Sequence, residues 1–106
     1  MTLQEFSESS NQLRRQYHQL EEKLHNTRWT REEDALAFLT DAALVGRWLM
    51  AKEGRWPSEQ EKNLPDKIGE CAWWLAVIAE RSGIDFAAAA ETFLLKTMQA
   101  MESEKE

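Results

Sequence analysis

The chain has few of the residues that build disulfide frameworks, phosphate-binding loops and membrane spans. One cysteine in 106 residues excludes an internal disulfide framework and fits a reducing compartment. The four glycines, at 46, 54, 69 and 83, are isolated, which excludes a glycine-rich phosphate-binding loop. The longest apolar run, over residues 71–79, is too short to cross a bilayer.

Positive charge is also scarce. Thirteen Lys and Arg oppose nineteen Asp and Glu, which gives a formal net charge of −6. A nucleic-acid-binding domain needs a basic stripe, and attachment to an anionic membrane needs a basic surface. We therefore expect neither nucleic acid nor a membrane as a partner. The polar first twelve residues lack the apolar segment of a secretory signal, so we expect a soluble cytoplasmic protein.

What the chain does contain is helical periodicity, with start and stop signals. Two Thr-x-x-Glu capping boxes, beginning at Thr2 and Thr30, predict two helix starts. The first helix fades near residues 25–26, and the second ends before Gly54. A third helix is expected over about residues 66–81. Asp85 is a suitable N-cap for a fourth. No alternating strand pattern of useful length is present.

These patterns predict an all-α protein with one domain over residues 1–100. The charged residues 101–106 are expected to form a disordered tail. Between residues 71 and 79 the third helix is apolar nearly all round, so it must be covered on more than one side. The three other helices of a small monomer cannot bury all sides of this apolar helix. We therefore predict a homo-oligomer, a dimer or else a tetramer, with the third and fourth helices at the interface.

Two stretches of the chain resemble a known family. They are ALAFLTDAALVGRWLMAKEG, at 35–54, and EKNLPDKIGECAWWLAVIAERSGIDFAAAAETFLLKT, at 61–97. Their pattern resembles the MazG-like all-α nucleotide pyrophosphohydrolases. The resemblance implies a four-helix MazG-like bundle that forms oligomers. It also implies Mg²⁺-dependent cleavage of a nucleoside triphosphate to a monophosphate and pyrophosphate.

The acidic motifs of that family are only half present. The family carries EExxE, or a shortened acidic version, on the second helix and ExxD on the third, and these groups hold Mg²⁺. Here the second-helix motif falls on Thr40, Asp41 and Leu44. The third-helix motif falls on Lys67 and Glu70. The resemblance thus leaves Asp41 and Glu70 as the metal ligands.

The resemblance also implies a substrate-binding set. Lys67 and Lys96 would contact the phosphates, and Trp48 or Trp74 would line a base pocket. For both tryptophans, packing in the core is the alternative interpretation, because large aromatic side chains at helical spacing are usually buried. No residue is singled out as catalytic.

Helix geometry explains why the missing carboxylates matter. Residues three apart share a helix face, so positions 41 and 44 point together, as do 67 and 70. If the two helices pack antiparallel, the four side chains converge. The Lys67 ammonium can then neutralise Asp41 and Glu70 without a metal. Because Mg²⁺ often uses only one or two protein carboxylates plus substrate phosphates, a weak or substrate-dependent site stays open.

Two functions therefore stand side by side. The first is a MazG-like nucleoside triphosphate pyrophosphohydrolase, weakly active or inactive because half of its metal-binding carboxylates are replaced. The second is a non-catalytic nucleotide-binding or protein-interaction module on the same helical fold. Among other candidates, His18 and His25 are expected to be solvated because no partner lies at ligand spacing. Cys71 is expected to be a small buried hydrophobic residue rather than a nucleophile.

Overall fold

The computed structural model describes residues 1–105, with side chains up to residue 104. It contains four long α-helices and the short 3-10 helix η1 (Glu61–Asn63). No strand occurs within the described part of the chain, and the predicted all-α class is confirmed. None of the described helices combines the length and the apolar character that crossing a membrane requires.

Helix α1 (Leu3–His25) begins at the first capping box. The Thr2 hydroxyl accepts a hydrogen bond from the Glu5 backbone N–H at 3.0 Å. The Glu5 carboxylate in turn accepts one from the Thr2 backbone N–H at 3.0 Å. Asn26 ends the helix in the left-handed conformation, with φ 56°, which asparagine adopts more readily than most residues.

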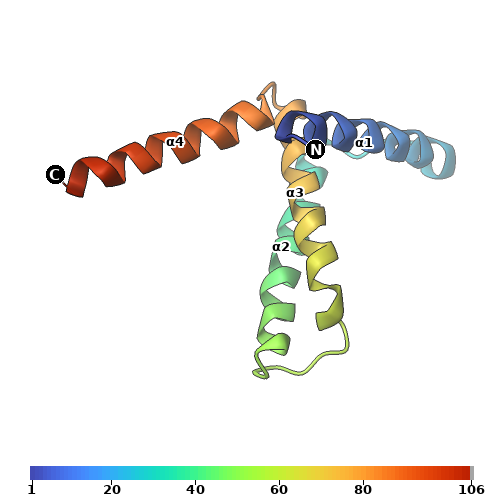
Figure 1. The fold of residues 1–106 in the computed structure, drawn as a ribbon. Coiled ribbons are helices and arrows are strands. Elements are labelled where there is room, and N and C mark those ends of the chain that lie inside the picture. Colours follow the sequence, from blue (N-terminus) through green and yellow to red (C-terminus); the bar gives the residue numbers. More distant parts are fainter. Residues whose placement is uncertain (106) are drawn as a thin grey trace.

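Helices α2 (Arg31–Lys52) and α3 (Leu64–Arg81) form an antiparallel hairpin at the centre of the fold (Figure 1). The second predicted capping box, at Thr30, starts α2. The connection turns at Gly54, whose φ of 76° favours glycine. Helix α3 begins slightly earlier than predicted. Pro65 lies in its first turn, where a missing N–H leaves no helical bond unmade.

Helix α1 packs across α3 near the end of the hairpin that is remote from Gly54. The Trp73 indole N–H donates to the Ser10 carbonyl at 2.9 Å. The Tyr17 ring meets Trp73 edge-on, with 5.8 Å between ring centroids. Trp73 is thus a fixed anchor between the two helices.

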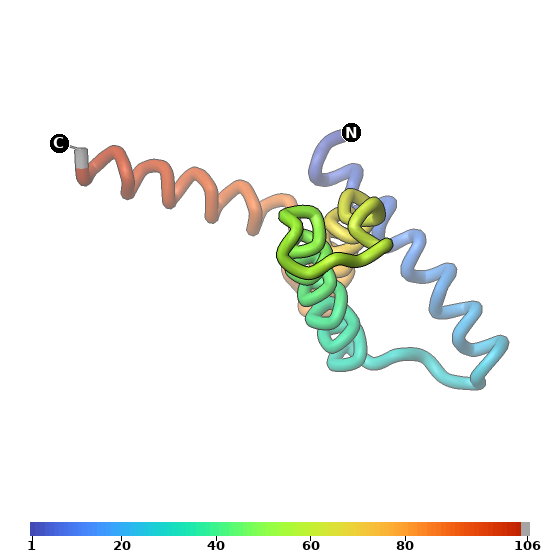
Figure 2. Tube along the Cα trace, turned by 90° about the horizontal axis from the view of Figure 1, so that it is seen from below, coloured from blue at the N-terminus to red at the C-terminus, as the bar shows by residue number. Residues whose placement is uncertain are grey.

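Helix α4 (Phe86–Lys105) leaves the body of the molecule. The Asp85 carboxylate caps it by accepting from the Ala88 N–H at 3.0 Å, as predicted. Its first turn contacts α1 and α3, and the remainder projects away on the side opposite to α1 (Figures 1 and 2). All side chains from 91 to 104 are exposed. The helix continues to Lys105 through the segment predicted as a tail, and Glu106 lies outside the described residues.

The interior of a single chain is small and unusually polar. Its buried apolar residues are mostly alanines: Ala51, Leu64, Trp74, Ala76, Val77, Ala79 and Ala87. Nearly as many polar or charged residues are buried with them: Ser10, Asn11, Arg14, His18, Asp34 and Asp41. Because buried polar groups need partners, these residues define the two clusters described next.

Candidate functional site

Lys67 on α3 is paired with two carboxylates, and one of them, Asp41, connects it to α2. Its ammonium donates to Asp41 Oδ1 at 3.1 Å and to Glu70 Oε1 at 2.8 Å. Asp41 comes from α2, whereas Lys67 and Glu70 lie three residues apart on one face of α3. We call these three residues the Lys67 triad. The structure thus brings together three of the residues that the sequence had singled out.

Two indole rings border the Lys67 triad. The Trp74 N–H donates to the second oxygen of Asp41, Oδ2, at 2.9 Å. The centroid of the Trp48 ring lies 5.5 Å from Lys67 Nζ, a distance at which a cation is attracted to a ring face. Trp74 is only 6% exposed. Core packing therefore describes Trp74, and its N–H also holds Asp41 in place.

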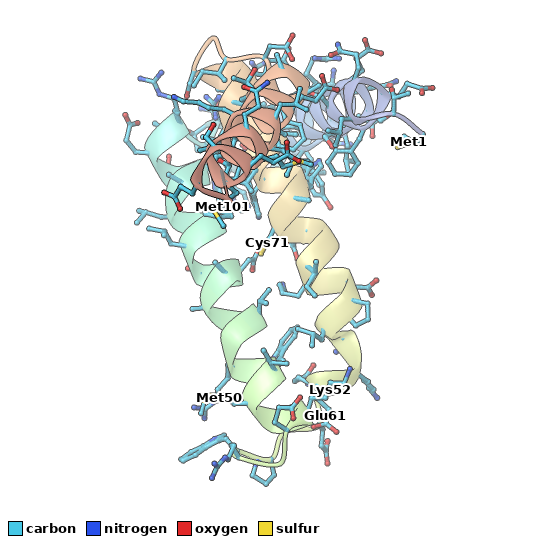
Figure 3. All side chains as sticks on the ribbon, turned by 60° about the vertical axis from the view of Figure 1, so that its left-hand side comes forward. Met1, Met50, Lys52, Glu61, Cys71 and Met101 are labelled. Carbon is cyan, nitrogen blue, oxygen red and sulfur yellow. The ribbon has the colours of Figure 1, made fainter. Side chains whose placement is uncertain are left out.

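The surroundings of the Lys67 triad raise the pKa of its lysine and of one neighbouring thiol. The hydrogen bond to Glu70 raises the pKa of Lys67; burial opposes this, and Asp41 adds to it. Cys71 follows Glu70 on α3, and its side chain lies on the side of that helix that faces α2 (Figure 3). Burial raises the pKa of its thiol, and the charges of Asp41 and Glu70 raise that pKa further. At neutral pH the lysine is therefore charged, and the thiol is protonated and a poor nucleophile.

The groups in the Lys67 triad do not fit the Mg²⁺ ion that the family resemblance implies. Each Asp41 oxygen already accepts a hydrogen bond, one from an ammonium and one from an indole. Mg²⁺ requires an octahedral shell of oxygen ligands, and a cation already lies beside both carboxylates. In the part of the chain that the structure describes, no group of three or more His, Cys, Asp or Glu is arranged to hold a metal ion.

Two other positions named from the sequence lie outside the Lys67 triad. Leu44 follows Asp41 by three residues on α2, so it shares that face but supplies no ligand oxygen. Lys96 lies in the exposed part of α4, which projects away from the hairpin (Figure 1). Within one chain the structure does not bring Lys96 to the triad, and its contact with phosphate stays a prediction.

A second charged cluster surrounds Asp34, two helical turns before Asp41 on α2. Asp34 is fully buried. It accepts from Arg14 Nη2 at 2.7 Å and from Arg81 Nη1 at 2.6 Å. The three side chains come from α2, α1 and α3, so one carboxylate holds three helices together. Removing a partner from such a buried pair typically destabilises a protein by about 3–5 kcal/mol.

Glu21 extends the Asp34 cluster along α1. It accepts from Arg14 Nη1 at 2.7 Å and from the Trp29 backbone N–H at 2.9 Å, and it lies 3.2 Å from His18 Nδ1. Burial disfavours its ionised form, but the bonds from Trp29 and Arg14 outweigh burial and lower the pKa of Glu21. His18 is buried. The expectation of a solvated histidine is wrong, because Glu21 and the neighbouring helices enclose it.

Asp34 was not among the residues singled out from the sequence, although the sequence contains a signal for it. Asp34 belongs to a row at alternating spacings of four and three, which is typical of a buried helix face. The row is Asp34, Phe38, Asp41, Val45 and Trp48. A carboxylate in such a row needs a charged partner. Its partners, Arg14 and Arg81, are 20 and 47 residues away, and spacing on one helix gives no information about them.

Comparisons of the chain with protein-family models, curated proteins and solved structures found no match. The all-helical arrangement is compatible with a MazG-like bundle. The resemblance itself rests on the residues quoted above and on no relative.

Proposed function

We propose that this chain is a non-catalytic helical module with a MazG-like fold, and that it acts by associating with a second copy of itself. The proposal rests on Lys67, whose ammonium is within hydrogen-bonding distance of both Asp41 and Glu70. The reaction that the resemblance implies requires a divalent ion at these carboxylates. An ammonium at that place balances their charge without any metal.

The shape of the single chain supports self-association. Its Cα radius of gyration is 17.0 Å, whereas a compact domain of this length has a radius of about 13 Å. Its accessible surface is 8102 Å², whereas a compact monomer of 12.3 kDa exposes about 6,100 Å². The excess of about 2,000 Å² per chain corresponds to about 4,000 Å² for a pair, which lies in the range that obligate homodimer interfaces bury.

The surface that a second copy would cover runs along α4. Ala87 and Ala90 start a stripe at helical spacing, which continues through Leu94, Met98 and Met101. Ala87 is buried against the rest of the chain, whereas the last three side chains are each more than half exposed. Met101 lies near the free end of the helix (Figure 3). The stripe therefore begins as core and continues without a partner among the described residues.

Helix α3 supplies the other half of the interface that we propose. Ile68 and Leu75 on α3 are both exposed, although they are large apolar residues on a central helix. A helix gains most of its stability from packing rather than from its own hydrogen bonds, so a projecting α4 needs a surface to pack on. The predicted dimer through α3 and α4 would bury the exposed apolar side chains of α3 and give α4 a surface to pack on.

A weakly active Mg²⁺-dependent nucleoside triphosphate pyrophosphohydrolase is the second candidate. Glu70 favours it, because its side chain is 42% exposed and can be reached by an ion that arrives with a substrate. Mg²⁺ is often held by one or two protein carboxylates together with substrate phosphates. In this candidate, Lys67 moves from the carboxylates to the phosphates when the ion binds.

A pyrophosphate assay and sedimentation separate the two candidates. With millimolar Mg²⁺ and ordinary or deoxy nucleoside triphosphates, we expect no pyrophosphate release above a control without protein. We expect a dimer by analytical ultracentrifugation at micromolar concentration. Turnover on the order of 1 s⁻¹ would establish the enzyme instead. A monomer at micromolar concentration would reject self-association, whichever result the assay gives.

A further inference from the structure

Arginines gather in one place on an otherwise acidic chain. They line a hollow of about 290 Å³ at the junction of α1, the segment that follows it, and the end of α3. The ionisable residues of its wall are Arg14, Arg15, Arg28, Arg81, His18 and Glu80. The lining of the hollow thus holds four arginines and one glutamate, in a chain whose net charge is −6. We call this hollow the arginine hollow.

Structural pairing explains only two of the four arginines. Arg14 donates one terminal nitrogen to Glu21 and the other to Asp34. Arg81 Nη1 donates to Asp34 and to the Trp29 carbonyl, at 2.6 and 3.1 Å. These two arginines balance a buried carboxylate and are needed for the fold itself.

The remaining donors have no such role. Among the described side chains, no carboxylate lies within ion-pair distance of Arg15. Arg28 is paired with Glu22 through Nε alone, so both of its terminal nitrogens remain available. His18 lines the same space, but its Nδ1 is directed to Glu21 and it is not counted among these donors. Five or more N–H groups from different directions thus border one small space.

We propose that the arginine hollow binds the phosphate group of a small, soluble phosphate monoester, with Arg15 and Arg28 holding its oxygens and Arg81 behind them. A guanidinium fork matches two phosphate oxygens at once. A phosphate monoester carries close to two negative charges at neutral pH. Its three terminal oxygens also accept from donors in several directions, whereas a carboxylate offers two oxygens in one plane.

The rest of the molecule restricts this ligand to a small one. Glu80 lies in the wall of the arginine hollow, and the chain as a whole is acidic. Both features oppose a polyanion such as nucleic acid and an extended anionic bilayer. The hollow is also separate from the Lys67 triad, because no triad residue lines it. Asp34, which pairs with Arg14 and Arg81 of the hollow, precedes Asp41 by about 10 Å along α2. The site does not depend on the self-association proposed above.

Titration with phenyl phosphate, followed by NMR, tests the site. We expect saturable shifts in the Nε–H signals of Arg15 and Arg28, and a weaker response of the same signals to inorganic phosphate. The double variant Arg15→Gln, Arg28→Gln should bind phenyl phosphate at least about tenfold more weakly, because two charge-assisted contacts are lost. The matched control Arg47→Gln, Arg55→Gln removes the same charge elsewhere and should bind like the wild type.

All four substituted arginines are exposed, so the variants should keep the fold, which circular dichroism checks. If the first double variant nevertheless unfolds, the single change Arg15→Glu takes its place and should abolish binding. Equal affinity of the wild type and the variant for phenyl phosphate would overturn the proposal. Binding to vesicles that contain phosphatidic acid, without binding to phenyl phosphate, would also overturn it by assigning the arginines to a lipid headgroup.

Discussion

At residue 67 a lysine lies between two carboxylates that would otherwise face each other. We expect Lys67→Met to lower the free energy of unfolding at pH 7 by about 1–3 kcal/mol, less than for a fully buried pair because Glu70 is partly exposed. At pH 5 the loss should be smaller. Without the ammonium, repulsion raises the pKa of one carboxylate, which then takes up a proton. Chemical denaturation at both pH values measures the difference.

The exposed Lys62 supplies a matched control for this prediction. Lys62→Met removes the same charge without touching the Lys67 triad and should change the unfolding free energy little at either pH. Alkaline pH gives a second comparison. The pKa of Lys67 is raised above 10.5 in the folded protein, so its contribution to stability is lost as pH rises through that higher value. Lys67→Met should lack this alkaline loss. Identical curves for Lys67→Met and the wild type would mean that the triad contributes nothing.

Residue-level reasoning predicted the Lys67 triad and missed the Asp34 cluster for a physical reason. Lys67 and Glu70 are three apart on one helix, and Asp41 reaches them once two adjacent helices pair in the simplest way. The pairing of Asp34 instead depends on Arg14. It therefore depends on the place where α1 crosses the hairpin. That crossing is fixed by long-range packing, which no local pattern encodes.

The helix starts were predictable because caps are local. Thr2, Thr30 and Asp85 each bond to backbone N–H groups within three residues, so four letters of sequence contain the signal. The extent of α4 was not predictable in the same way. Its last turn consists of charged and polar residues, and composition alone favoured a tail. In the structure the helix continues to Lys105.

The pairing of α2 with α3 can be tested by building the missing carboxylates. Leu44→Glu with Lys67→Glu would add two carboxylates to Asp41 and Glu70, which makes four acidic groups. Without metal, this variant should be less stable than the wild type because like charges crowd one place. Millimolar Mg²⁺ should then raise its melting temperature by several degrees through mass action, while leaving the wild type nearly unchanged. Differential scanning calorimetry with and without Mg²⁺ gives both quantities.

The control for this pair is Ala43→Glu with Lys62→Glu, which makes the same charge change on exposed positions. It should show no specific response to Mg²⁺. If millimolar Mg²⁺ does not change the melting temperature of the Leu44→Glu, Lys67→Glu variant, positions 41, 44, 67 and 70 do not form one ligand set. In that case the family resemblance would carry no information about a site.

At the scale of the whole molecule, one chain does not enclose its own apolar surface. Phe93, Leu94 and Leu95 on α4 are each more than half exposed, and so are Leu36 and Leu39 on α2. The sequence showed that these helices have apolar faces. It could not show which faces meet within one chain and which stay exposed on it, because both cases produce the same periodicity.

Substitution on α4 tests this view of the molecule. Leu94→Glu with Met98→Glu places two charges on the stripe that continues the buried Ala87. We expect the dissociation constant of the dimer to rise at least about a hundredfold, because the variant would bury unpaired charges at the centre of the interface. Analytical ultracentrifugation over a range of protein concentrations measures the effect. The melting temperature of the wild type should rise with protein concentration, and that of the variant should not.

A matched variant distinguishes a lost interface from a general effect of charge. Thr92→Glu with Gln99→Glu adds the same two charges to α4, on residues turned away from Leu94 and Met98 by the helical repeat. This variant should remain a dimer. If it dissociates as readily as Leu94→Glu with Met98→Glu, net repulsion between acidic chains explains both results, and the stripe is not the interface. If neither dissociates, the association uses a different surface, and the apolar side chains of α4 require another partner.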